Sequence, residues 1–140
     1  MIIYSPSMPL IDGSQAFLLT IADYVRIAEG AKILTHDYGC SVLKQSDSDS
    51  ITSGRILGAK SMVDICSSVF IGMNDILTRG VAIGDRVIIG AGSMVTKDCP
   101  SNGVHAGNPT GRIMDLETCY RKRETLQFQE AKAMALRYME

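Results

Sequence analysis

Large aliphatic residues recur at every sixth position over two stretches of the chain. Counting in sixes from Ile21 gives IADYVR, IAEGAK and ILTHDY, and counting from Ile65 gives ICSSVF, IGMNDI, LTRGVA, IGDRVI, IGAGSM and VTKDCP. All nine hexads begin with Ile, Leu or Val, and in seven of the nine the fifth residue is small or β-branched. A period of six fits neither an amphipathic helix nor a simple strand, but it fits a short strand followed by a sharp corner.

This repeat predicts stacked triangular coils. Three hexads close one coil, so the first residue of each hexad fills the interior and the fifth lies in the tighter space near a corner. Glycines such as Gly84 and Gly90 suit corners where the backbone approaches closely. Nine hexads make about three coils, which is near the minimum for burying a continuous core. We therefore predict an all-β fold, a single-stranded parallel β-helix, whose hand the period does not determine.

The predicted divisions of the chain follow the places where the period holds and stops. We expect a single domain over residues 1–140 that ends in a helix rich in helix formers, which would cap the open end of the stack. The period is interrupted by a loop that carries the polar run KQSDSDSITSGR, and long loops in compact repeats are often functional. The predicted parts are an N-terminal segment (1–20), a first coil (21–38), an extruded loop (39–64), further coils (65–100) and a C-terminal helix (114–138).

Composition and charge favour a small ligand. Fourteen basic and fifteen acidic residues, with no run of five Lys or Arg, give no reason to expect nucleic acid or an anionic membrane as partner. The four cysteines form no Cys-x-x-Cys pair and are expected to be free thiols. The start of the chain does not read as a signal peptide, and no apolar run approaches the ~20 residues of a membrane span. These features predict a cytoplasmic protein that does not insert into membranes.

Several motifs resemble those of a known family. IGDRVI, IGAGSMVTKD and PSNGVHAGNP resemble the closing coils of bacterial hexapeptide-repeat acetyltransferases, and ILTHDY resembles the Thr-His-Asp segment of their capsular and exopolysaccharide O-acetyltransferases. The stretch from Leu116 to Lys132 resembles their C-terminal helix. The resemblance implies a left-handed β-helix, acetyl-CoA as acyl donor with no metal, a sugar or polysaccharide-precursor hydroxyl as acceptor, and a homotrimer with active sites between subunits. Family members commonly carry more sequence before the first hexad, so the first coil and part of the acceptor pocket are expected to be reduced.

His36 is the predicted general base. Acetyl transfer to a hydroxyl requires removal of the hydroxyl proton, stabilisation of an oxyanion and alignment of two substrates. A neutral imidazole, with an unperturbed pKa of about 6.5, suits the first task, and the resemblance gives this role to the histidine of ILTHDY. Asp37 is expected either to hold the imidazole tautomer or to serve the loop. His105 is expected to be mainly structural and Cys40 to be a non-catalytic thiol.

The resemblance also places CoA in a groove between subunits, with the pantetheine arm against the backbone of the IGAGSM coil. Glycines there permit close approach, and backbone N–H groups at a glycine-rich corner are the expected oxyanion donors. Two basic residues match the family positions that meet the CoA phosphates, and their separation of about one coil predicts that they lie close together. The predicted CoA-binding residues are Gly90, Ala91, Gly92, Lys97, Arg112 and Asn74, the last with a plain corner asparagine as its alternative.

Three other functions share this architecture. A γ-type carbonic anhydrase requires three histidines on zinc, whereas this chain has two histidines in total. The tail of a nucleotide-sugar pyrophosphorylase follows a nucleotide-binding domain that this sequence lacks. A non-catalytic or degenerate trimeric scaffold stays open as the alternative to the enzyme.

Overall fold

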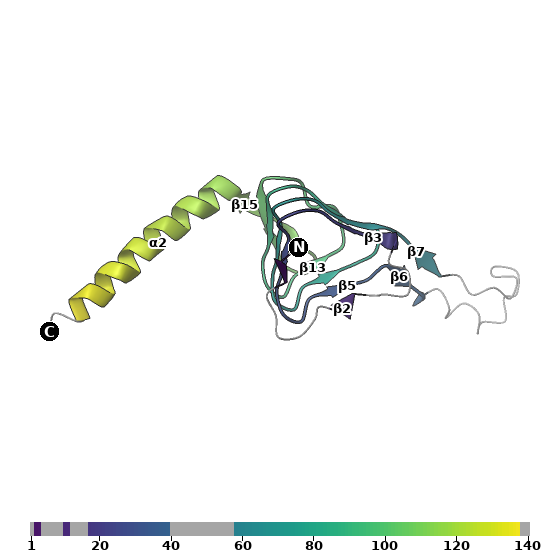
Figure 1. The fold of residues 1–140 in the computed structure, drawn as a ribbon, viewed down its shortest axis with the longest axis horizontal. Helices are drawn as coiled ribbons and strands as arrows, with labels where there is room; N and C mark the ends of the chain where they lie inside the picture. Colours follow the sequence, from purple (N-terminus) through teal and green to yellow (C-terminus); the bar gives the residue numbers. More distant parts are fainter. Residues whose placement is uncertain (1, 4–9, 12–16, 40–57, 138–140) are drawn as a thin grey trace, which may run out of the picture.

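The computed structural model describes residues 2–3, 10–11, 17–39 and 58–137. Their short strands wind around a three-sided core, which Figure 1 views as a stack of triangles. Paired residues on one face are 18 residues apart where no loop intervenes: Asp64 pairs with Ala82, Phe70 with Ile88, and Ile76 with Met94. Each coil therefore contains three hexads, as the sequence predicts.

The strands form three parallel sheets, here called faces A, B and C. Face A consists of β1 (Ile2–Ile3), β4 (Arg26–Ile27), β9 (Phe70–Ile71), β12 (Val87–Ile89), β14 (Gly103–Ala106) and the antiparallel β15 (Gly111–Asp115). Face B consists of β2 (Leu10–Ile11), β5 (Lys32–Ile33), β10 (Ile76–Leu77) and β13 (Met94–Val95). Face C consists of β3 (Leu19–Ile21), β8 (Val63–Ile65) and β11 (Ala82–Ile83). A separate antiparallel pair joins β6 (His36–Asp37) to β7 (Ala59–Lys60).

The core is built from the first and fifth residues of the hexads. Eight of the nine first residues are at most 1% exposed, and the ninth, Ile21, packs partly buried against them. Eight of the nine fifth residues are buried as well, and Asp37 is the exposed exception. The buried first residues are Ile27, Ile33, Ile65, Ile71, Leu77, Ile83, Ile89 and Val95.

The coils extend further than the predicted boundaries. In the N-terminal segment, Ile3 pairs with Ile27 on face A and Leu10 pairs with Lys32 on face B. The described residues before β4 therefore place a strand on each of the three faces, and the expected reduction of the first coil is not found there. The coil also resumes at Val63, inside the predicted loop, while residues 40–57 of that loop lie outside the described part of the chain.

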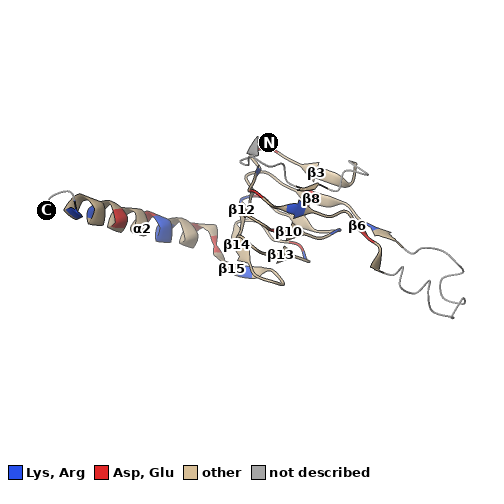
Figure 2. Cartoon of the chain, turned by 90° about the horizontal axis from the view of Figure 1, so that it is seen from below, with Lys and Arg blue, Asp and Glu red and all other residues tan. Residues whose placement is uncertain are grey.

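The C-terminal helix α2 (Leu116–Arg137) projects away from the coils (Figures 1 and 2). Every residue from Tyr120 to Arg137 is exposed, so the expectation that the helix caps the open end of the stack is wrong. Its apolar side chains do not share one face: Leu126 and Phe128 are two residues apart, which is about 200° around a helix. In the described residues, no helix has the length and apolar character needed to cross a membrane.

Candidate active site

His36 lies at the corner between faces B and C, where the chain leaves the coil stack. Thr35 is still fully buried, and its carbonyl accepts the N–H of Ser61 at 3.2 Å. His36 then pairs with Lys60 across the antiparallel strands β6 and β7. This strand pair holds the histidine, partly buried, at the margin of the coils.

The imidazole of His36 is oriented by two neighbours. Its Nδ1 lies 2.8 Å from the hydroxyl oxygen of Thr35. Its ring stacks on Tyr38, with centroids 6.0 Å apart and planes inclined by 19°. If Nδ1 carries the proton, it donates to the Thr35 hydroxyl, and the lone pair of the neutral ring is then on Nε2. Nothing in the sequence indicated that Thr35 has this role in orienting His36.

Asp37 engages the beginning of the loop and a neighbouring coil. Its Oδ1 accepts the N–H of Gly39 at 2.7 Å, and its Oδ2 lies 3.8 Å from Nε of Arg79. The Asp37 and Arg79 side chains are 57% and 37% exposed, so solvent screens this ion pair strongly. The carboxylate therefore links the loop to the next coil at this corner.

A pocket of about 470 Å³ opens beside His36. Two threonines of this pocket were not identified from the sequence. Thr78 and Thr96 are second residues of face-B hexads, and they stack in line with Leu34 in adjacent coils. The signal was available, because every third hexad returns to the same face. The Thr78 hydroxyl donates to the Val95 carbonyl at 2.9 Å. The pocket is lined by Leu34, His36, Asp37, Thr78, Arg79 and Thr96.

The corner between faces A and B brings Asn74 next to the Gly90–Gly92 turn. Gly92 N–H donates to the carbonyl of Met73 at 2.8 Å, so the two turns stack in adjacent coils. A Cβ on Gly90 would lie 2.9 Å from the Cβ of Ala106, so coil packing alone requires this glycine. Gly92 has φ of 74° and open space where a Cβ would stand. Its backbone is therefore accessible at the surface.

The two predicted basic residues lie on different sides of the triangle. Lys97 is exposed and follows Thr96 at the corner between faces B and C, beside the His36 pocket. Arg112 lies on β15 of face A, and its guanidinium donates to the carbonyl of Asn102 at 3.1 Å. The expectation that these two residues lie close together is therefore not met within one protomer. The predicted site residues on the coils divide between the two ends of face B.

The second histidine is packed into the end of the coil stack. His105 is 3% exposed, and its Nε2 lies 3.1 Å from the carbonyl oxygen of Pro100. Within the described ranges, no group of three or more His, Cys, Asp or Glu side chains is arranged to hold a metal ion.

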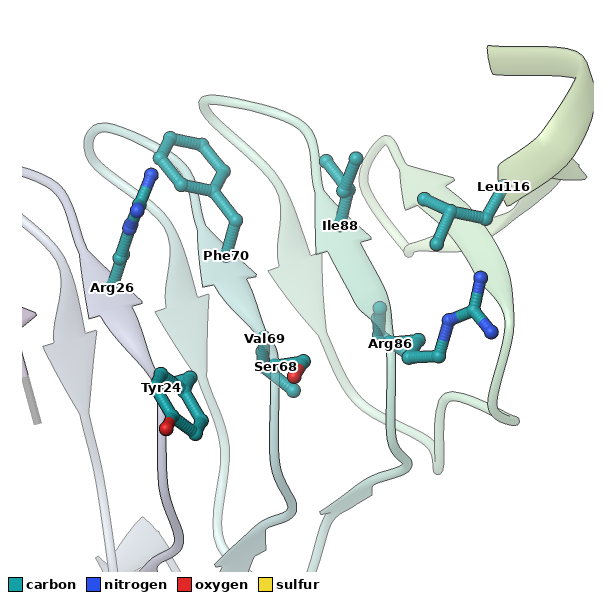
Figure 3. Close-up of a pocket in the computed structure, with 9 residues that line it drawn as sticks. Tyr24, Arg26, Ser68, Val69, Phe70, Arg86, Ile88 and Leu116 are labelled. Atoms are coloured by element: carbon teal, nitrogen blue, oxygen red, sulfur yellow. The ribbon is translucent and has the colours of Figure 1, made fainter. Parts of the chain in front are cut away.

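A second pocket of about 490 Å³ lies on the outside of face A (Figure 3). Phe70 and Ile88 lie between Arg26, on β4, and Arg86, which directly precedes β12. Leu116 closes it at the start of α2. None of the predicted site residues lines this pocket, which separates it from the candidate active site.

Several known proteins are similar to this chain. No family model matches the chain. Protein CapG of Staphylococcus aureus is 39% identical over 105 residues, which are 75% of this chain and 57% of CapG. The galactoside O-acetyltransferase of Escherichia coli K12 is 46% identical over 54 residues, covering 39% of this chain and 27% of that enzyme. The solved structure of a maltose O-acetyltransferase from Clostridium difficile 630 superposes with a TM-score of 0.58 and 39% identity, covering 70% of this chain and 48% of that one. The homologues of this chain are acetyltransferases of the hexapeptide-repeat family.

The fold that the chain shares with these acetyltransferases gives the coils their hand: the parallel β-helix is left-handed. The fold is shared with a hexapeptide-repeat acetyltransferase of Vibrio cholerae that was solved in complex with acetyl-CoA, at a TM-score of 0.56 and 24% identity. The chain spans about half the length of the hexapeptide-repeat relatives that it matches over most of its own length.

Proposed function

We propose that the protein transfers the acetyl group of acetyl-CoA to a hydroxyl of a sugar or polysaccharide precursor, with His36 as general base. The observation that carries this proposal is the imidazole of His36, which is fixed by the Thr35 hydroxyl beside a polar pocket. The relatives named galactoside and maltose O-acetyltransferases support the reaction class. A cytoplasmic location stays a prediction.

The proposed reaction needs no covalent intermediate on the protein. With Nδ1–H donated to Thr35, Nε2 of His36 takes the proton from the acceptor hydroxyl while its oxygen attacks the thioester carbonyl. The tetrahedral oxyanion then collapses, the C–S bond breaks, and the imidazolium returns the proton to the leaving CoA thiolate. Asp37 positions the start of the loop, and with it the acceptor side of the pocket.

The proposed CoA site combines two protomers of a homotrimer. In one chain, His36 and Lys97 lie at one end of face B, whereas Asn74 and the Gly90–Gly92 turn lie at the other. Symmetric copies can place the His36 corner of one protomer against the Gly90–Gly92 corner of the next. Pantetheine then lies along that turn, and Lys97 and Arg112 meet the phosphates.

Substitution of His36 tests the mechanism. His36→Ala is expected to lower kcat at least ~10²-fold, the usual effect of losing a general base. CoA release from acetyl-CoA would be measured with a panel of sugar acceptors. The affinity for acetyl-CoA, measured by calorimetry, should stay within about twofold, because the proposed role of His36 is to deprotonate the acceptor hydroxyl and not to bind CoA. Full activity in this variant would remove His36 from the mechanism. Absence of both binding and turnover in the wild-type protein would instead favour the non-catalytic trimeric scaffold.

A further inference from the structure

Asp75 is a carboxylate buried inside the coil, at the corner between faces A and B. It is fully buried, at the fifth place of IGMNDI, where the equivalent residues of the adjacent coils are Ala31 and Ser93. Its Oδ1 accepts the N–H of Ser93 at 2.8 Å, and its buried Oδ2 has no hydrogen-bond partner among the described residues. A half-satisfied buried carboxylate destabilises a fold. Stability alone therefore does not account for this residue.

The Gly90–Ser93 turn is held differently from the turns stacked beside it. In the two preceding coils, the N–H of the fifth residue binds a carbonyl of its own turn. Ala31 N–H lies 3.5 Å from the carbonyl oxygen of Ala28, and Asp75 N–H lies 3.4 Å from that of Gly72. Ser93 N–H instead binds the Asp75 carboxylate at 2.8 Å, while the Ser93 hydroxyl donates to the carbonyl of Gly90. The side chains of Asp75 and Ser93 thus add to the backbone bond from Gly92 N–H to Met73 in holding this turn.

The same network reaches the layers on both sides of this turn. Gly107 N–H donates to the Ser93 hydroxyl oxygen at 3.1 Å, which ties the turn to the segment after the coils. On the other side, a Cβ on Gly72 would lie 2.6 Å from the backbone nitrogen of Ala91, so the two turns are packed in close contact. Ala91 and Gly92, which form the exposed part of the turn, therefore sit on a rigid polar support.

We propose that Asp75 is a positioning residue whose buried carboxylate, by holding the Ser93 N–H, sets the shape of the Gly90–Ser93 turn that receives the pantetheine arm of CoA. This inference rests on the proposed function for its ligand. The link between Asp75 and Ser93 itself rests on the coil geometry alone.

The test compares Asp75→Ala with a matched carboxylate at another corner. Alanine fits the fifth place of a coil at this corner, because Ala31 occupies it one coil earlier. In the control, Asp85→Ala removes an acceptor that binds the N–H of Ser67 at 2.9 Å, away from the Gly90–Ser93 turn. Calorimetry should show about tenfold weaker acetyl-CoA binding for Asp75→Ala, the scale of one hydrogen bond to a charged group, and a change within about twofold for Asp85→Ala.

Two further readouts separate positioning from general stability. KM for acetyl-CoA should rise in Asp75→Ala while kcat stays within about threefold, and Asp75→Asn, which keeps an oxygen for Ser93, should recover most of the affinity. Without ligand, amide hydrogen exchange at Gly92 and Ser93 should be faster in Asp75→Ala than in the wild type. If amide exchange and acetyl-CoA affinity were both unchanged in Asp75→Ala, the inference about Asp75 would be overturned, and the proposed function would not be affected. Failure of the wild-type protein to bind acetyl-CoA would overturn the proposed function and, with it, the CoA part of the inference.

Discussion

At the scale of single residues, the protonation of Asp75 is coupled to folding. Burial raises the pKa of this carboxyl above its ordinary 3.8, against the opposing effect of the backbone N–H groups of Ser93, Gly72 and Gly92. An acid whose folded-state pKa is raised contributes stability that is complete below its unfolded pKa and is lost as the pH rises through the folded pKa.

This coupling predicts a pH-dependent difference between Asp75→Ala and the wild type. The Tm of the wild-type protein, relative to that of Asp75→Ala, should fall as the pH rises from about 4 to about 8. Over this range the buried carboxyl of Asp75 loses its proton, and burial of the charged form costs stability. Thermal unfolding followed by circular dichroism measures both values. A difference in Tm that does not change with pH would show that Asp75 ionises equally easily in the folded and unfolded chains.

Thr35 offers a second prediction at this scale. Thr35→Val keeps the shape of the buried side chain but removes the hydroxyl that lies 2.8 Å from Nδ1 of His36. Because the ring loses one of the two neighbours that orient it, kcat should fall about tenfold while acetyl-CoA affinity stays unchanged. Thr125→Val, on α2, removes a threonine hydroxyl that donates to the carbonyl of Arg121, away from His36, and serves as the control. Equal kcat values for the two variants would contradict the role given to Thr35.

Two aspartates at the same hexad place show what the sequence could not decide. Asp37 and Asp75 both break the small-residue pattern of the fifth position, yet Asp37 is exposed and Asp75 is buried. Asp37 faces the N–H of Gly39 at the start of the loop, whereas Asp75 faces the N–H of Ser93 from the next coil. The outcome depends on a neighbour 18 residues away, which a period within single hexads does not reveal.

At the scale of elements, the strands were predictable because the same positions of each hexad are buried in every coil. The first residue of each hexad enters the core, so the period alone places strands such as β9 and β10. The helix was also predicted close to its bounds, at 114–138 against the observed Leu116–Arg137. Its placement was not predictable, since helix propensity describes the local backbone and not the surface on which a helix packs.

Asp115 directly precedes α2 and caps its first turn, so its removal should weaken that helix. Its Oδ1 accepts the N–H of Thr118 at 2.7 Å, its Oδ2 accepts the Thr118 hydroxyl at 2.8 Å, and these bonds lower the pKa of the carboxyl. Asp115→Ala should therefore reduce the helical circular dichroism signal, and Asp115→Asn should restore most of it. Glu117→Ala, which removes only an exposed pair with Arg121, is the control. An equal loss of signal in both alanine variants would argue against Asp115 as the cap.

At the scale of the whole molecule, the division of the site residues between two corners predicts complementation between protomers. His36→Ala and Ala91→Trp each disable one corner of the proposed site, and Ala91 is exposed enough to accept a larger side chain. In trimers mixed at equal ratio, about one quarter of the sites combine an intact His36 corner with an intact Ala91 corner, because each corner is intact in half of the copies.

The measurement is activity after co-expression of the two variants, with the mass of the assembly checked by light scattering. Activity near one quarter of the wild-type value supports a site shared between neighbouring copies. Mixtures no more active than the separate variants would place the whole site within one chain and contradict the shared arrangement.

The coil closes again at the point where the chain leaves it, since the Ser61 N–H binds the Thr35 carbonyl and β8 continues face C. The insertion between these two residues therefore leaves the stacking register of the coils unchanged in this chain. Under the proposed function, acceptor preference can therefore diverge by exchange of this insertion, while the turns proposed to bind the donor retain their geometry. If the proposed reaction holds, a chimaera that carries another insertion at this junction should keep the coils and change only the acceptor that it uses.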